Sequence, residues 1–422
     1  MRVLLLTLGT RGDVQPFVAL GRGLKEAGFD VTLCTSDRFE PFVEAHGLRY
    51  AYLNSELLAL TDDPEARRAL EGSKRKALEL IGHVKPVIRR TLDEAWAAAQ
   101  GADLIVYHPK ALAGYSLAEK LGVPGVLSLP APLLTPTAAF PNPLLPRVSW
   151  GGWANRLSYV LSRFVTAPYR GVLNDWRQVL GLPGRPLGAN DLVKPDGEPV
   201  RALYSVSPHV VPEPDDWPEH THMTGYWFLD ERHAYEPPDA LVRFLAAGPP
   251  PVYVGFGSIA GSSPAAATEV VLEALRRTRQ RGILATGWGG LAAEALPETV
   301  FKLDAAPHDW LFPRVTAVVH HGGAGTTAEG LRSGKPSVIC PFFGDQPFWG
   351  ERVHDLGVGP APLPQKRLTA DALEAAIRAA TSDQEVRRRA ERLGEALRGE
   401  DGVRTAIQIV QAALRRSRAA SL

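Results

Sequence analysis

Short apolar runs alternate along the chain with glycine or polar turns and with amphipathic stretches of helical spacing. The first apolar run, Val3–Leu8, predicts a strand, and the run Val31–Thr35 predicts another. Between them, Pro16 suits the first turn of a helix that ends at Ala27. This order of strand, helix and strand is a βαβ unit, and its repetition in both halves of the chain predicts an α/β fold with parallel sheets.

The rest of the first half keeps this rhythm until a proline-rich segment interrupts it. Residues 61–100 are charged and predict helix, whereas Leu104–Tyr107 and Arg201–Val206 predict strands. From Pro130 to Pro146 six prolines stand among Leu, Ala, Phe and Thr, which excludes helix and central strand. Two interpretations of this segment stay open: a plain surface loop, or a loop that lines a pocket for an apolar compound.

The second half restarts the pattern after a stretch rich in Pro, Asp, Trp and His. Val252–Gly255 and Ile283–Thr286 predict strands, and a helix is expected between them from about Ala265 to Arg281. The interdomain linker is therefore predicted near residues 230–240.

These elements divide the chain into three parts. We predict an N-terminal domain over residues 1–232 and a C-terminal domain over residues 233–402, both Rossmann-like. Residues 403–422 predict a final helix, whose apolar positions need a surface to cover them. We expect this helix to pack back across the domain boundary.

Composition narrows the classes of partner. At 422 residues the chain exceeds what one hydrophobic core usually supports, which agrees with two domains. Lys and Arg number 47 against 46 Asp and Glu, so no net basic field would collect nucleic acid. We expect a monomer or a weak dimer. Transient contact with a membrane surface is compatible with the composition.

The expected compartment follows from apolar runs and cysteines. No stretch reaches 18 uninterrupted apolar residues, and the N-terminal run is too short for a signal peptide. The two cysteines, Cys34 and Cys340, lie in apolar runs in different halves, as buried thiols in a reducing compartment would. The sequence therefore predicts a cytoplasmic protein.

The most distinctive segment is a glycine-rich turn in the C-terminal third. Residues 317–329 read Ala-Val-Val-His-His-Gly-Gly-Ala-Gly-Thr-Thr-Ala-Glu, an apolar strand that breaks into a turn and reopens as a helix expected near Thr326. Glycines allow backbone N–H groups to approach an anion, and the positive end of the helix dipole favours a phosphate there. The alternative is a capping box from Thr326 to Glu329 that needs no ligand. Two adjacent imidazoles, His320 and His321, stand where the strand meets the loop and favour the ligand site.

Several segments together resemble the signature of one known family. These segments are residues 307–314 (Pro-His-Asp-Trp-Leu-Phe-Pro-Arg), 318–331, 334–336 (Gly-Lys-Pro), 341–350 (Pro-Phe-Phe-Gly-Asp-Gln-Pro-Phe-Trp-Gly), 9–16 (Gly-Thr-Arg-Gly-Asp-Val-Gln-Pro), 207–212 and 224–229. In them the chain is similar to the nucleotide-sugar-dependent glycosyltransferases of family 1, and within that family to the sterol 3-beta-glucosyltransferase branch and related bacterial enzymes.

The resemblance implies the GT-B architecture, in which two Rossmann-like domains face each other across a cleft. The first domain would hold a lipophilic acceptor such as a sterol, terpenoid or polyketide, and the second a UDP-sugar, most simply UDP-glucose. No Asp-x-Asp motif occurs in the chain, so we expect no metal and no other cofactor. A catalytically silent relative that binds a nucleotide sugar and helps another protein is the alternative.

The resemblance also assigns donor-binding roles to particular residues. His321 and the backbone of Gly323, Ala324, Gly325 and Thr326 would bind the diphosphate, together with the side chain of Ser258. Glu329 would bind both ribose hydroxyls, with a helix-capping role as the alternative. Asp345 and Gln346 would bind sugar hydroxyls, unless they form only a turn. Trp288 and His308 match the segments that hold the nucleobase.

Catalysis needs a base opposite the donor, and Asp13 is the candidate. Asp13 stands at the place where many members of the family carry a histidine. Its carboxylate would accept the acceptor's proton as the new bond forms, and a single displacement would invert the anomeric carbon to give a β-glycoside. The alternative is an Asp N-cap for the helix at Pro16. His108 and Arg11 are candidates for secondary acid/base or acceptor contacts, although His108 is equally well explained as a loop histidine without a role.

Overall fold

The computed structural model describes residues 1–56, 74–146, 151–164, 166–194, 196–256, 264–285 and 296–420. Within these ranges the strands form two sheets in which every pairing between strands is parallel. The α/β class predicted from the sequence is therefore confirmed. None of the helices in these ranges is long and apolar enough to cross a bilayer.

The first sheet has the order β3-β2-β1-β4-β5-β6-β7, so the first strand lies in the middle. Its strands are β1 (Arg2–Leu6), β2 (Asp30–Ser36), β3 (Arg49–Leu53), β4 (Leu104–Tyr107), β5 (Gly125–Leu129), β6 (Arg201–Tyr204) and β7 (Thr221–Met223). The helices that accompany them are α1 (Arg11–Glu26), α2 (Glu40–Ala45), α5 (Lys74–Ala99), α6 (Gly114–Leu121), α7 (Gly152–Ser158) and α8 (Arg170–Val179). Buried side chains of α1 pack on one face of the sheet, and those of α5, α6 and α8 pack on the other.

The second sheet has the order β10-β9-β8-β11-β12. Its strands are β8 (Val252–Gly255), β9 (Gly282–Ala285), β10 (Val300–Leu303), β11 (Ala317–His320) and β12 (Ser337–Ile339). The helices around it are α9 (Asp239–Ala246), α10 (Pro264–Thr278), α11 (His308–Leu311), α12 (Ala324–Arg332), α13 (Gln346–Asp355), α14 (Ala370–Ser382) and α15 (Gln384–Gly399). Buried residues of α10 and α14 cover one face, and those of α9 and α11 cover the other.

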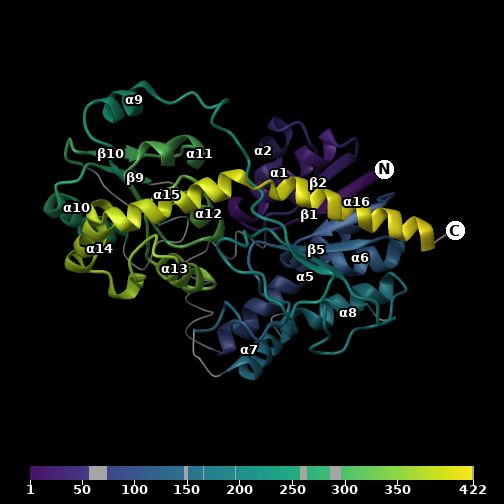
Figure 1. Ribbon diagram of the computed structural model, residues 1–422. Coiled ribbons are helices and arrows are strands. Elements are labelled where there is room, and N and C mark those ends of the chain that lie inside the picture. The colour runs from purple at the N-terminus through teal and green to yellow at the C-terminus, as the bar shows by residue number, and fades with distance from the viewer. Residues whose placement is uncertain are drawn as a thin grey trace.

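The last helix, α16 (Gly402–Ala420), lies against the first half of the chain. Figure 1 shows α15 and α16 running from the second sheet's side of the molecule across to the side that contains β1 and β2. Val410 and Leu414 belong to the same buried cluster as residues of β1 and α1. Gly23 of α1 permits this approach, because a Cβ at that position would lie 2.6 Å from a methyl group of Val403.

The start of α1 differs from the sequence prediction. α1 begins at Arg11, so Pro16 lies inside the helix rather than in its first turn. Thr10 is the N-cap residue, and Asp13 completes a capping box because its side chain accepts a hydrogen bond from the Thr10 N–H. Asp13 is therefore not the N-cap. The earlier start is favoured because the cap satisfies a free backbone donor, while Pro16 removes a single intrahelical hydrogen bond.

The proline-rich segment contains neither helix nor strand, as predicted. Thr135 nevertheless fixes it to the first sheet, because its backbone N–H donates to the hydroxyl oxygen of Tyr204 over 2.9 Å. Phe140 lies near Phe348 of α13, with ring centroids 6.1 Å apart. The segment is thus a packed loop between the two halves of the chain, and Pro130 is the part of it that lines the pocket described below.

Candidate active site

Asp13 is held in one position at the carboxyl edge of the first sheet. The loop after β1 brings Thr10 beside it, and the Thr10 N–H donates to Asp13 Oδ2 over 2.8 Å. Gly9 has a φ of 148°, and a Cβ there would lie 2.1 Å from the same oxygen. A side chain at residue 9 would therefore collide with the carboxyl group. The carboxyl is almost completely buried, with Asp13 8% exposed.

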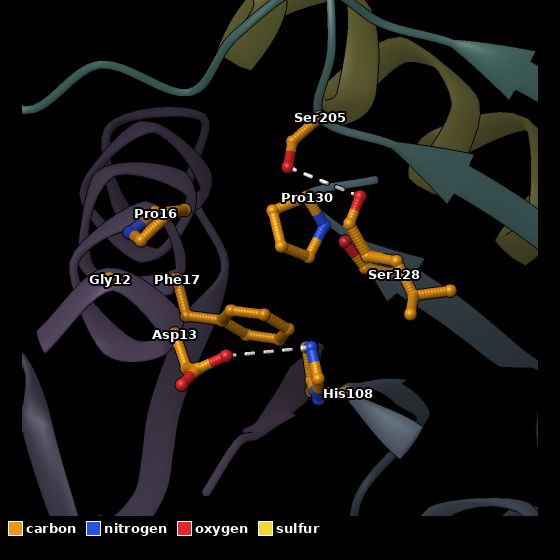
Figure 2. A pocket seen from close by; sticks show the side chains of 9 residues that line it. Gly12, Asp13, Pro16, Phe17, His108, Ser128, Pro130 and Ser205 are labelled. Carbon is orange, nitrogen blue, oxygen red and sulfur yellow. Dashed lines mark hydrogen bonds and ion pairs between the residues drawn. The ribbon is translucent and has the colours of Figure 1, made fainter. Parts of the chain in front are cut away.

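The other carboxyl oxygen of Asp13 faces two basic side chains from the loop after β4. Lys110 Nζ lies 2.7 Å from Asp13 Oδ1. His108 Nε2 lies 3.8 Å from the same oxygen, as the dashed line in Figure 2 shows. Burial alone would raise the pKa of Asp13, but the ammonium of Lys110, the ring of His108 and the hydrogen bonds from Lys110 and Thr10 outweigh it. The pKa lies below its ordinary value, so the group is a carboxylate at neutral pH.

His108 is a buried, neutral imidazole rather than a charged one. Burial lowers its pKa to about 4, an effect that the nearby Asp13 only partly offsets. Its Nδ1 accepts a hydrogen bond from the Lys110 backbone N–H over 3.1 Å. The ring proton therefore resides on Nε2, the nitrogen that faces Asp13. This arrangement suits a hydrogen-bond donor to the carboxylate or to a bound hydroxyl, and not a general acid at neutral pH.

A small pocket opens beside this group. Figure 2 shows Phe17, Pro16 and Pro130 around it, with Asp13 and His108 at one end and Ser128 and Ser205 at the other. The ring of Phe17 meets the His108 ring edge-on, with centroids 6.4 Å apart. The walls are thus largely apolar, and the carboxylate is the polar group at which a hydroxyl could be deprotonated.

The glycine-rich turn lies at the corresponding edge of the second sheet. α12 begins at Ala324 with Gly323 as its N-cap, so the expected start near Thr326 and the capping box from Thr326 to Glu329 are wrong. Gly323 takes the extended conformation of an N-cap and its carbonyl accepts from the Thr327 N–H, which starts the helix two residues earlier. The N–H groups of Ala324 to Thr326 consequently stand at the helix start, where they have no intrahelical partner. They form the type of cradle that binds phosphate.

Both histidines of the turn are neutral. Burial lowers the pKa of His321 to about 4, against a smaller opposing effect of the Gly255 carbonyl. A Cβ at Gly323 would lie 2.5 Å from His321 Nε2, so the glycine allows the ring to stand against the turn. His320 is fully buried, and its Nδ1 accepts from the Gly322 N–H over 3.1 Å. His321 is therefore the ring beside the cradle, while His320 supports the turn.

Glu329 is a buried carboxyl with an unsatisfied oxygen. It is 6% exposed, and its Oε2 has no hydrogen-bond partner among the described residues. Burial raises its pKa to about 8, assisted by Asp309 and by two acidic residues of the linker, and the charge of Arg332 opposes this. An unsatisfied buried acceptor is costly unless a ligand donates to it. Hydroxyl groups such as those of a ribose would fit.

Asp345 and Gln346 form the start of α13. Asp345 Oδ2 accepts from Trp349 Nε1 over 2.9 Å, and Gln346 Oε1 accepts from the Phe342 N–H over 2.7 Å. Burial raises the pKa of Asp345, and the charges of Lys110 and Asp13 act on it in opposite directions. Asp345, in the second half of the chain, is thus close enough to Asp13 and Lys110, in the first half, for their charges to act on its carboxyl group.

Sequence comparison gives the family. Residues 3–139 match the model of the glycosyltransferase family 28 N-terminal domain, and residues 285–404 match that of the erythromycin biosynthesis protein CIII-like C-terminal domain. One sterol 3-beta-glucosyltransferase of Arabidopsis thaliana is 40% identical over 97% of this chain and 65% of its own length. A second one from the same organism is 38% identical over 96% of this chain and 67% of its own length. The chain belongs to the glycosyltransferase family that contains the sterol 3-beta-glucosyltransferases.

Solved structures confirm the GT-B fold for this glycosyltransferase. The glycotransferase of kitacinnamycin superposes with a TM-score of 0.73 at 22% identity, covering 98% of this chain and 99% of that one. Glycosyltransferase VinC, in complex with dTDP, superposes with a TM-score of 0.66 at 20% identity over 98% and 100%. The chain spans about two thirds of the two plant relatives.

The remaining predicted residues of the glycosyltransferase lie as follows. His308 is stacked on Phe312 with centroids 4.3 Å apart, and burial lowers its pKa to about 4. Arg11 is not among the residues that line the Asp13 pocket, and its Nη2 lies 2.6 Å from Glu231 Oε2 in the linker. Ser258 and Trp288 lie outside the described residues. No group of three or more His, Cys, Asp or Glu in the described ranges could hold a metal ion, and metal independence stays a prediction.

Sequence reasoning missed three residues of this site. Lys110 binds Asp13, Asp309 accepts from the backbone of the linker at Glu231, and Arg332 lies 3.9 Å from Glu329. A signal existed for Lys110, because it follows His108 by two residues at the carboxyl end of a strand. Asp309 lies within the similar segment 307–314, but nothing in the sequence indicated its contact with the linker. No comparable signal marked Arg332, which lies beside the buried carboxyl of Glu329.

Proposed function

We propose that this glycosyltransferase transfers glucose from UDP-glucose to a hydroxyl of a sterol or a similar lipophilic alcohol, with inversion at the anomeric carbon. The observation that carries the proposal is the buried, ionised Asp13, fixed at the edge of an apolar pocket and within electrostatic reach of Asp345 in the other half. A carboxylate so placed is a base for an acceptor hydroxyl, and the glycine-rich turn opposite it is suited to a nucleotide diphosphate.

In the proposed step the acceptor oxygen attacks the anomeric carbon while its proton passes to Asp13. The bond between that carbon and the diphosphate oxygen breaks, and UDP leaves with the electron pair. The N–H groups of Ala324 to Thr326 and the ring of His321 would stabilise the charge that develops on the diphosphate. One displacement gives a β-glycoside from an α-linked donor. Because these N–H groups and the His321 ring could stabilise the diphosphate charge themselves, they support a metal-independent reaction.

The choice of donor and acceptor rests on the relatives. The two plant proteins are called sterol 3-beta-glucosyltransferases, which supports glucose and a sterol. Glycosyltransferase VinC, which has the same fold, was solved with dTDP. A donor with a pyrimidine nucleoside diphosphate agrees with that neighbour, and the choice of uridine over thymidine is the more specific part of the proposal. The unsatisfied oxygen of Glu329 supports the ribose site, because ribose supplies two hydroxyl donors.

The test is an acceptor and donor screen in the presence of a metal chelator, followed by replacement of the base. We expect UDP-glucose and a sterol to give a product whose anomeric proton coupling in NMR is that of a β-glucoside. Asp13→Asn keeps the shape of the side chain but removes its basicity, and should lower kcat by about 10²- to 10⁴-fold with UDP binding retained. The exposed Asp175→Asn is the matched control and should behave as the parent protein.

The possible outcomes separate the proposals. Full turnover by the Asp13→Asn variant would remove the base assignment, and an α-linked product would remove the single-displacement mechanism. UDP-sugar binding without transfer to any acceptor would instead favour the helper-protein alternative. Activity that requires an added divalent cation would refute metal independence.

A further inference from the structure

The two oxygens of Asp13 are held in different ways. Oδ2 accepts hydrogen bonds from the N–H and the hydroxyl of Thr10, over 2.8 and 3.3 Å, and so belongs to the start of α1. Oδ1 is bonded to Lys110 Nζ over 2.7 Å and also faces His108 Nε2. The oxygen that is available for an acceptor proton is therefore the one that Lys110 occupies.

Lys110 can leave this position without a change in the backbone. It lies in the short 3₁₀ turn η2 (Pro109–Ala111), whose backbone is fixed by the hydrogen bond to His108. Its side chain is 58% exposed, whereas that of Asp13 is 9% exposed. One partner of this ion pair is thus buried and rigid, and the other is a flexible chain in contact with water.

The charge of Lys110 also acts on a carboxyl group of the second half of the chain. Besides Asp13 and His108 in the first half, the described groups that it influences include Asp345 at the start of α13. A bound nucleotide sugar would add the charge of its diphosphate at the start of α12, on the same side as Asp345. That added charge would attract the ammonium of Lys110 and compete with Asp13 for it.

We propose that Lys110 is a positioning residue for Asp13: it holds Oδ1 in the donor-free enzyme and turns toward the anionic donor when one binds, which frees Oδ1 for the acceptor hydroxyl. This inference rests on the proposed transfer reaction. It gives the enzyme a base that stays ionised inside a mostly apolar pocket, and it couples the availability of that base to the presence of a donor. Asp13 would then be exposed to the acceptor only in the ternary complex.

The kinetic test compares two pH profiles. The acidic limb of kcat/KM for the donor reports Asp13 in the free enzyme, and that of kcat reports it in the complex. Lys110→Met should shift the acidic limb of kcat/KM to higher pH by about one unit, so that kcat/KM falls roughly tenfold at pH values below the limb. The acidic limb of kcat should stay at the same pH. Lys110→Arg should retain the parent profile, as should the exposed control Lys120→Met. The quantity to compare is the pH at which the limb falls. The absolute value of kcat/KM is not used, because it also reflects donor affinity.

Two kinetic results would overturn the inference. If Lys110→Met leaves the limb of kcat/KM unmoved, Lys110 does not act on Asp13. If both limbs move by the same amount, the ammonium stays on Asp13 in the complex and the release step is wrong.

A second measurement does not depend on turnover. Unfolding free energies of the parent protein, Asp13→Asn, Lys110→Met and the double variant give the coupling between the two side chains. We expect clear coupling in the ligand-free protein and a much smaller one at saturating UDP. Undiminished coupling with UDP bound would refute the release step. Coupling that behaves as expected in a protein that transfers no sugar would uphold the role of Lys110 and remove the proposed reaction instead.

Discussion

Glu329 shows at the scale of one residue how a buried carboxyl group makes stability depend on pH. Its pKa is raised to about 8 by burial, compared with an ordinary value of 4.5. The folded protein therefore holds a proton on this group that the unfolded chain has already lost between these two pH values. Its contribution to stability is fully present below pH 4.5 and is lost as the pH rises through 8. We expect this loss to be on the order of a few kcal/mol.

Glu329→Gln should flatten this part of the stability curve, because an amide does not titrate. The measurement is the unfolding free energy by chemical denaturation at intervals between pH 5 and 8.5. The exposed Glu395→Gln serves as the control and should keep the slope of the parent protein. If Glu329→Gln keeps that slope as well, the raised pKa of Glu329 is wrong.

The sequence identifies residues better than it identifies their partners. Asp13 and His321 could be found because each follows an apolar strand and belongs to a motif. The contact of Lys110 with Asp13 could not, because 97 residues separate them and the contact exists only since β1 and β4 are neighbours in the sheet. The role of Arg11 near the acceptor stays a prediction, and its ion pair with Glu231 could not be predicted because it depends on the path of the linker, which no local pattern encodes.

At the scale of an element, the turn between β11 and α12 depends on two glycines in different ways. Gly322 has a φ of 89°, and a Cβ there would lie 2.6 Å from Ile339. Gly323 has an ordinary φ of −61°, so only the His321 ring, 2.5 Å from the position of a Cβ, stands against a side chain. Gly325 has no described atom within 4 Å of such a Cβ.

This difference gives a matched pair of variants. Gly323→Ala should destabilise the protein by about 1–3 kcal/mol and weaken UDP binding, because the His321 ring must move out of the turn. Gly325→Ala lies two residues further along the same helix start and should be neutral or stabilising by up to about 1 kcal/mol, since alanine is the better helix former. Denaturant unfolding and UDP titration of both variants make the comparison. Equal stability of the two would show that the His321 ring does not press on the turn.

Element types were easier to predict from the sequence than their ends. The strands β1, β2, β4, β6, β8 and β9 lie where apolar runs predicted them, because such runs fit a sheet that is buried on both faces. The two wrong helix starts, at Pro16 and Thr326, share one cause. In each case the prediction placed the helix start at a residue type that is common there, Pro or Thr. The helices instead begin earlier, with Thr10 or Gly323 as the N-cap residue.

At the scale of the whole molecule, the proposed site draws on both halves of the chain. Asp13, the proposed base, lies in the first half, and the glycine-rich turn and Asp345 lie in the second. α15 packs against α12, and α16 continues from it onto α1, as Figure 1 shows. At the junction, the Ser207 hydroxyl donates to Glu400 Oε1 over 2.7 Å. The sequence showed an apolar stripe on the last helix, but the stripe alone could not specify the groove that receives it.

This helix pair leads to a prediction about the coupling of the two halves. Val410 of α16 is fully buried against the first half. Val410→Asp would bury an unpaired carboxylate, at a cost of about 3 kcal/mol or more, which favours release of α16 from α1. We expect calorimetry to resolve two unfolding transitions where the parent protein has one, and the transfer rate to fall while UDP affinity is retained. UDP affinity should persist because the glycine-rich turn and Glu329 lie wholly in the second half.

Gln408→Asp adds the same charge to the exposed face of the same helix and should leave both transfer and unfolding unchanged. The comparison separates the charge from its burial. If Val410→Asp transfers sugar at the parent rate although α16 has been released, then the linker and the contacts around the cleft are enough to bring Asp13 to the donor. In that case α16 would contribute stability alone, and the register of the two halves would be set by the packing of the cleft itself.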